Sequence, residues 1–154
     1  MRITLQILLA SLVGALAGGV VIGCKSVDRP ASGSFASVRI QGHTSEQIRA
    51  ATAVVFQQDG YAAMDVHHAK MVFEKTASRW DRIAYGNWID DAPTTVRVRV
   101  LVAPVSNEMF DLRCEAFSVR HKGEATYEEE VRLKNNRSEP YQALLEKVLG
   151  RLAR

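Results

Sequence analysis

The sequence predicts an α+β fold, a two-layer domain in which a mostly antiparallel sheet of about five strands carries two helices on one face. The clearest strand is at residues 94–102, where valines at every second position would share one face. Apolar stripes at helical spacing, within 44–60 and 138–154, predict the two helices. If the two helices cover the apolar face of the sheet, the valine face of the strand and the apolar stripes of both helices are buried together.

The first half of the domain has the pattern of a strand, a helix and a hairpin. Residues 35–40 alternate and predict a strand. Thr44 with Gln47 three positions later forms a capping-box pattern for the first helix, and Gly60 ends it where a left-handed conformation is favoured. At 61–76 the apolar period is two on either side of a polar turn, which predicts a hairpin.

For the second half of the domain, the sequence predicts a turn at 104–108, a long strand at 109–120 and a final helix. Within 109–120, the apolar residues first share one face of the strand, but Phe117 and Val119 lie on the opposite face. This change predicts a bulge or a second buried surface. Ser138 is the expected cap of the last helix. The apolar stripe of that helix consists of Tyr141, Leu144, Leu145, Val148, Leu149 and Leu152.

The first 24 residues form a segment apart from this domain. Arg2 gives a positive start, and residues 3–22 form a mostly apolar run without a charged residue. A run of this length could span a bilayer as an uncleaved anchor. A charged start, an apolar middle and a small residue at the end also describe a secretory signal peptide. The run closes on Val21-Ile22-Gly23-Cys24, which resembles the lipobox of bacterial lipoproteins.

The lipobox resemblance implies a domain organisation and a location. Residues 1–23 would be a lipoprotein signal peptide, and Cys24 would be lipidated on its sulfur and become the first residue of the mature chain. Residues 24–34 would be the lipidated cysteine and a flexible tether, and 35–154 a single α+β globular domain. Lys25 stands where an aspartate would favour the inner membrane. The resemblance therefore implies a membrane-anchored lipoprotein that faces the periplasm, at the outer membrane rather than the inner.

Charge and cysteine content exclude two classes of protein. The chain has 20 Lys and Arg residues, of which only Arg2 precedes Cys24, and 17 Asp and Glu residues. The basic residues are interleaved with acidic ones, which is not the footprint of nucleic-acid binding. Cys24 and Cys114 are the only cysteines, so no disulfide framework is predicted. Cys114 lies in an apolar stripe, where a free cysteine behaves as a small hydrophobic residue.

A second resemblance concerns the fold. The predicted helix ends in Val55-Phe56-Gln57-Gln58-Asp59-Gly60-Tyr61, and the hairpin after it contains Val72-Phe73-Glu74-Lys75. This combination is similar to the helix-grip domains of lipoprotein subunits of the outer-membrane β-barrel assembly machinery. The resemblance implies a helix-grip-like packing and no chemistry, because fold alone does not fix function.

The residue types that could carry catalysis do not form a complete set. Asp65, His67 and His68 are the densest cluster and would be the residues of a hydrolase. Adjacent residues of a strand point to opposite faces, so the two histidines need a turn to bring them together and a third partner to act with. We therefore predict no catalytic residues, no metal site and no cofactor.

Two groups of side chains are candidates for binding a partner. Trp80, Tyr85 and Trp88 lie in the stretch 77–93, where they either plug the end of the sheet or anchor a partner. Arg97 and Arg99 lie on the polar face of a strand, where they either solubilise it or hold an anionic head group or partner. The acidic run at 128–130, in the unpatterned stretch 123–137, has the composition of a solvated face.

The leading hypothesis is a lipid-anchored cell-envelope protein that acts as a non-enzymatic protein-binding or structural module. Its partners would be the membrane, through the lipid, and an envelope protein. One alternative is a carrier of a small apolar ligand or lipid in a cavity between helices and sheet, which Leu and Phe side chains filling that space would exclude. The other is the hydrolase built on Asp65, His67 and His68.

Overall fold

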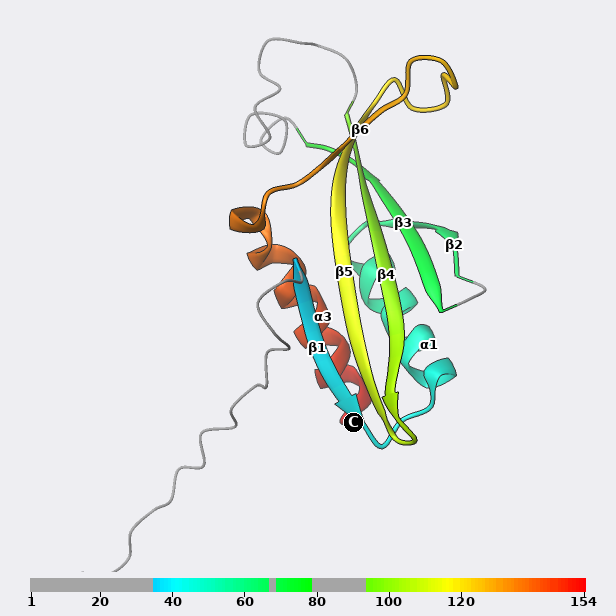
Figure 1. Ribbon diagram of the computed structural model, residues 1–154, viewed down its shortest axis with the longest axis vertical. Helices are drawn as coiled ribbons and strands as arrows, with labels where there is room; N and C mark the ends of the chain where they lie inside the picture. The colour runs from blue at the N-terminus through cyan, green and yellow to red at the C-terminus, as the bar shows by residue number, and fades with distance from the viewer. Residues whose placement is uncertain (1–34, 67–68, 79–93) are drawn as a thin grey trace, which may run out of the picture.

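The computed structural model describes residues 35–66, 69–78 and 94–154 (Figure 1). The described elements are β1 (Ala36–Gln41), α1 (Ser45–Gln58), β2 (Ala62–Asp65), β3 (Lys70–Thr76), β4 (Thr95–Ser106), β5 (Met109–Arg120), β6 (Glu129–Arg132), the 3-10 turn η1 (Asn135–Arg137) and α3 (Glu139–Leu152). The domain is α+β with an antiparallel sheet and two helices, as the sequence predicts. Its sheet has six strands where about five were expected.

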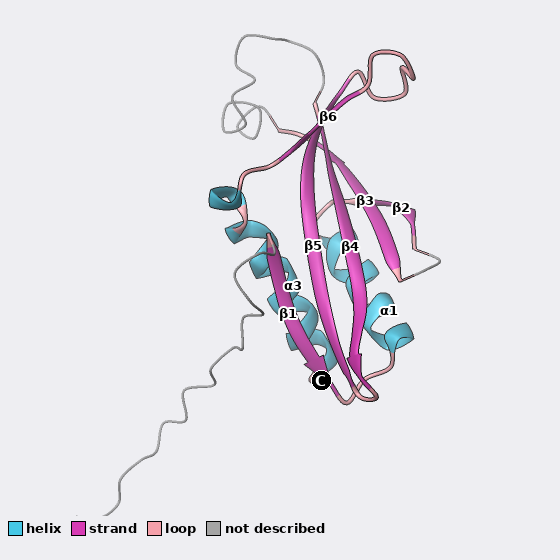
Figure 2. Cartoon of the chain, in the orientation of Figure 1, coloured by secondary structure: helices cyan, strands magenta, loops and turns pink. Residues whose placement is uncertain are grey.

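The strands follow the order β1-β5-β4-β3-β2, and every neighbouring pair is antiparallel. β6 pairs with β5 at residues 117–120, beyond the part of β5 that pairs with β1. The sequence did not predict β6, because its only aliphatic residue, Val131, is half exposed and gives no alternation. Figure 2 shows both helices on the same side of the sheet.

The core lies between the helices and one face of the sheet. Alternate residues of β4 point into it, and Val98 and Val100 are fully buried there. From the helices, Phe56 stacks on Phe73 of β3 with ring centroids 4.6 Å apart, and Leu145 is fully buried. Phe56, Phe73 and Leu145 thus fill part of the space between the two layers.

The two helices begin in different ways. At α1 the predicted capping box is confirmed: the Gln47 backbone N–H donates to Thr44 Oγ1 at 3.2 Å, and the Thr44 backbone N–H donates to Gln47 Oε1 at 2.9 Å. Gly60 follows α1 with a φ of 88°, as expected for the residue that ends it. At α3 the expected side-chain cap from Ser138 is wrong, since Ser138 has helical dihedral angles and makes no capping hydrogen bond. η1 runs directly into α3, so the chain does not enter this helix from an extended residue.

The long hairpin corrects one expectation and decides between the two alternatives of another. Pro104 does not begin a turn but lies inside β4. The Val102 N–H donates to Ala69 on the β3 side, and Pro104 faces the same side beyond the end of β3, so the proline removes no ladder bond. In β5 the pairing with β4 continues without a bulge through Phe117 and Val119. Both residues are buried on the face away from the helices, which confirms the alternative of a second buried surface.

Candidate functional site

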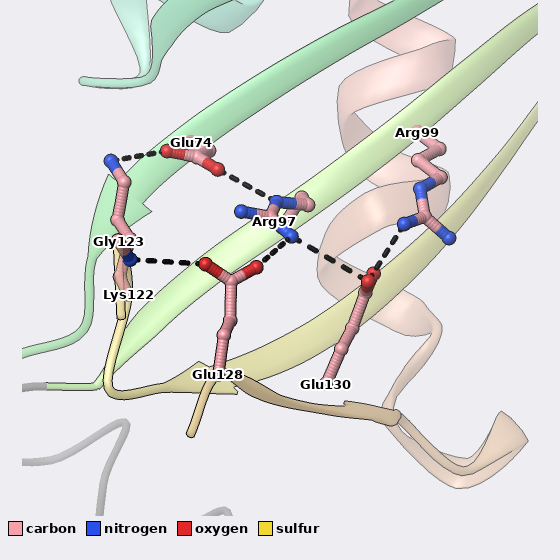
Figure 3. A network of polar contacts seen from close by, with 7 residues as sticks. All are labelled: Glu74, Arg97, Arg99, Lys122, Gly123, Glu128 and Glu130. Carbon is pink, nitrogen blue, oxygen red and sulfur yellow. Dashed lines mark hydrogen bonds and ion pairs between the residues drawn. The ribbon is translucent and has the colours of Figure 1, made fainter. Parts of the chain in front are cut away.

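The outer face of the sheet, opposite the helices, carries a network of charged side chains (Figure 3). Because alternate residues of β4 point into the core, Arg97 and Arg99 both point to this outer face. The carboxylates that meet them come from three places in the chain: Glu74 on β3, Glu128 just before β6, and Glu130 on β6.

Arg97 is the centre of this network. Its Nε donates to Glu74 Oε1 at 2.7 Å, and its Nη1 donates to Glu128 Oε1 at 2.8 Å and lies 3.5 Å from Glu130 Oε2. The Arg97 side chain is only 16% exposed. Arg99 Nη2 donates to the same Glu130 oxygen at 2.7 Å, and the Arg99 guanidinium lies 4.4 Å from the ring centre of Phe117.

Glu74 is the most buried carboxylate of the network, with a side chain 5% exposed. Burial by itself would raise its pKa, but hydrogen bonds and positive charge from Lys122 and Arg97 hold the pKa below its usual value. The pKa of Glu128 is also lowered, first by a hydrogen bond from the Gly123 backbone N–H at 3.0 Å and then by Arg97. These carboxylates therefore remain charged at neutral pH.

The ion pairs of this network join three strands, β3, β4 and β6. Glu130 on β6 pairs with Arg99 on β4 across the intervening strand β5. Carboxylates of the chain itself thus pair with Nε and Nη1 of Arg97 and with Nη2 of Arg99. The sequence placed both arginines on the polar face correctly, but it did not reveal that the acidic run at 128–130 supplies their partners.

A second cluster of charges lies further along the outer face. Asp111 on β5 is almost fully buried and accepts hydrogen bonds from Arg39 Nε at 3.0 Å and Arg113 Nη2 at 2.8 Å. Burial opposes ionisation of Asp111, but the two guanidinium groups lower its pKa nevertheless. This cluster could not be predicted from the sequence, because Arg39 and Asp111 meet through the β1–β5 pairing.

Most of the other predicted site residues fall where the structure gives no description. Cys24, His67, His68 and the aromatic residues Trp80, Tyr85 and Trp88 lie outside the described residues. Asp65 of the hydrolase hypothesis ends β2, all of whose residues are exposed. Among the residues that the structure describes, no group of three or more His, Cys, Asp or Glu side chains has the arrangement of a metal site. No helix of the described ranges is long and apolar enough to cross a membrane.

Cys114 lies in the core, as the sequence predicts, and is 1% exposed. Burial, with a further contribution from the charge of Glu115, raises the pKa of Cys114 to about 12. The thiol is therefore protonated at neutral pH and is a poor nucleophile.

A pocket opens at one end of the two layers, between the helices and the sheet. It has a volume of about 340 Å³ and lies between the C-terminal end of α1, the adjoining ends of β3 and β4, and the first half of α3. Its buried lining residues are Tyr61, Val96, Tyr141 and Leu144. Residues this far apart in sequence become neighbours only through the packing of α3 on the sheet.

Comparison with known proteins gives no family for this chain. No family model matches it, and no curated protein matches it. One similar solved structure is the adenylate sensor from AMP-activated protein kinase, crystallised in complex with 5-aminoimidazole-4-carboxamide 1-beta-D-ribofuranotide. It has a TM-score of 0.43 and 16% sequence identity, over 75% of this chain and 93% of that chain. A likeness at this level carries no argument about function.

Proposed function

We propose that this chain is a lipid-anchored protein of the bacterial cell envelope, whose domain binds another envelope protein and catalyses no reaction. The observation that carries this proposal is the lipobox-like Val21-Ile22-Gly23-Cys24 at the end of an uncharged apolar run. Each acyl methylene buried in a bilayer contributes about 0.8 kcal/mol, and stable attachment takes more than one acyl chain. The lipobox resemblance implies a lipid on the Cys24 sulfur and a further acyl chain on its new amino group, which together would satisfy this requirement. With Lys25 next to it, the anchor would lie in the outer membrane and face the periplasm.

The short distance between anchor and domain supports a function at the membrane surface. The Phe35 ring packs on the Tyr141 ring of α3 with centroids 5.2 Å apart, so the chain is fixed to the domain from Phe35 onward. Residues 25–34 span at most about 33 Å when fully extended. A domain held on such a tether meets partners that are themselves at or near the same membrane.

The partner-binding residues of this proposal are Trp80, Tyr85 and Trp88. Large aromatic side chains dominate the binding energy of many protein interfaces. Arg97 and Arg99 have a different role in the proposal, because their guanidinium groups already hold Glu74, Glu128 and Glu130. They would keep β6 in place and would not meet the partner directly.

The test combines crosslinking and thermal melts of full-length variants. Trp80→Ala and Trp88→Ala are each compared with Tyr127→Ala, which removes an aromatic side chain that is 70% exposed. If a tryptophan anchors the partner, its removal weakens binding by about thirtyfold, the hot-spot threshold, while the melting temperature barely changes. The specific adduct in crosslinked envelopes then disappears.

The opposite result is equally clear. Adducts that persist while the variant loses about 3 to 5 kcal/mol of stability, as for a buried aromatic truncation, would mean that the tryptophan plugs the fold and does not bind the partner. The Tyr127→Ala control should change neither the adduct nor the melt.

A further inference from the structure

The pocket beside α3 combines a buried apolar floor with a charged rim. The floor consists of Tyr61, Val96, Tyr141 and Leu144, each less than a tenth exposed. The rim consists of Asp59, Lys75, Thr76, Pro140, Ala143 and Lys147. A second hollow of about 400 Å³ shares Asp59 and Lys147 with it, and Arg151 and Arg154 contribute to its lining.

The two lysines of the rim are held very differently. Lys75 Nζ donates to the backbone carbonyl of Asp59 at 2.6 Å, lies 3.6 Å from Asp59 Oδ2 and stands 5.2 Å from the ring centre of Tyr61. It is thus fixed at the C-terminal end of α1, where a cation is favourable. Among the described residues, the partner of Lys147 Nζ is Asp59 Oδ1, at 3.6 Å, and the Lys147 side chain is 62% exposed. That separation is too long for a hydrogen bond.

The described residues of the rim therefore carry an excess of one positive charge. One carboxylate, Asp59, is shared between two ammonium groups, and it is the only acidic residue among the described residues that line the pocket. The adjoining hollow adds the positive charge of Arg151. A ligand with a single negative charge would match this excess, and Lys147 is the ammonium group free to turn toward it.

The size and floor of the pocket restrict the rest of the ligand. A volume of about 340 Å³ is near the lower limit for small-molecule pockets, roughly 300 to 1,000 Å³. The floor offers aromatic and aliphatic surface from Tyr61, Tyr141 and Leu144, on which one apolar group can rest. We propose that this pocket binds a small carboxylic acid with one apolar or aromatic group, whose carboxylate pairs with Lys147. The inference does not depend on the lipid anchor.

The experiment follows the tyrosines of the pocket in the full-length protein. The protein is labelled with 3-fluorotyrosine, held in phosphatidylcholine nanodiscs and titrated with 4-phenylbutyrate while fluorine NMR spectra are recorded. Single Tyr→Phe variants assign the signals of the four tyrosines. We expect saturable shifts at Tyr61 and Tyr141 and none at the exposed Tyr127. The neutral amide of the same acid should bind about threefold more weakly, in the range of a solvent-exposed ion pair.

Two substitutions with opposite expected effects separate recognition of charge from simple filling of the pocket. Lys147→Met keeps most of the aliphatic stem and should weaken binding of 4-phenylbutyrate about threefold without changing binding of the amide. Asp59→Asn removes the competing carboxylate and should strengthen binding of 4-phenylbutyrate. Lys134→Met, an exposed lysine that does not line the pocket, is the matched control and should have no effect.

Three results would overturn the proposal. They are the absence of shifts at Tyr61 and Tyr141, equal affinity for the acid and its amide, and a loss of affinity in Asp59→Asn like that in Lys147→Met. Thermal melts of each variant confirm that the fold is intact before affinities are compared.

Discussion

The two faces of the sheet are held by different forces, although their residues alternate along the same strands. On the inner face Val98 and Val100 are fully buried beneath the helices. On the outer face Arg97 and Arg99 pair with carboxylates of β3 and β6. Burial of apolar surface responds little to pH, whereas ion pairs depend on the charge of each partner. One β-strand can thus serve two environments, and each should respond to a different perturbation.

The largest expected effect is on the inner face. Leu145 on α3 is fully buried, and Leu145→Ala should lower the free energy of unfolding by about 2 to 5 kcal/mol because it leaves a cavity. Leu101 on the outer face is 41% exposed, so Leu101→Ala should cost less than about 0.5 kcal/mol. Denaturant unfolding measures both. Equal losses would contradict the assignment of the core to the helix side.

On the outer face the largest effect is expected at Glu74. Glu74→Gln removes a buried charge that accepts from Arg97, and should lower the free energy of unfolding by about 1 to 3 kcal/mol at pH 7. Glu115→Gln is the matched control, since the pair of Glu115 with Arg132 is exposed on both sides and should contribute less than about 1 kcal/mol. A loss in Glu115→Gln as large as that in Glu74→Gln would mean that burial does not set the strength of these pairs.

Acid should weaken the outer face. The pKa values of Glu74 and Asp111 are lowered in the folded protein, so their stabilisation is complete above the ordinary carboxyl pKa of about 4 and is lost as the pH falls through the lowered values. Unfolding curves at pH 7 and at about pH 3 should show this loss. The loss should be smaller in Glu74→Gln, and the remainder should include the contributions of Asp111 and Glu128, whose pKa values are also lowered. An unchanged pH dependence in Glu74→Gln would exclude Glu74 as a contributor.

The smallest effects compare the starts of the two helices. Thr44→Ala breaks a capping box and should cost about 1 kcal/mol. Ser138→Ala removes no capping hydrogen bond, because the Ser138 side chain makes none, and should change stability by less than about 0.5 kcal/mol. Equal costs in the two variants would show that Ser138 caps α3 in solution.

Most of the fold could be predicted because its signals are local. The capping box of Thr44 and Gln47 and the apolar stripe of α3 each lie within a few residues of sequence. The errors arise where a neighbour from elsewhere in the chain decides the outcome. Pro104 fits inside β4 because β3 ends before reaching it. β6 is held by its pairing with β5 and by ion pairs, since its one aliphatic residue, Val131, is half exposed.

The binding regions were harder to predict for the same reason. Arg97 and Arg99 could be placed on the polar face from alternation, but Glu128 and Glu130 are about thirty positions away, and only the sheet order brings them near. In retrospect, Glu128 and Glu130 have the same two-residue spacing as Arg97 and Arg99, and this shared spacing was a signal that the two pairs could meet on one face of the sheet. The sequence suggested a cavity between helices and sheet only as an alternative, and it could not place the pocket beside α3, since the floor of that pocket needs residues from both ends of the domain.

The central claim is that Cys24 carries the lipid, and labelling with radioactive palmitate tests it most directly. Wild-type protein is compared with Cys24→Ser and with Cys114→Ala, which removes the only other cysteine, a buried thiol with a pKa raised to about 12. We expect label in the wild type and in Cys114→Ala, and none in Cys24→Ser, which should remain an unprocessed or unlipidated precursor. Label retained by Cys24→Ser, or absent from the wild type, would contradict the account of this chain as a lipoprotein.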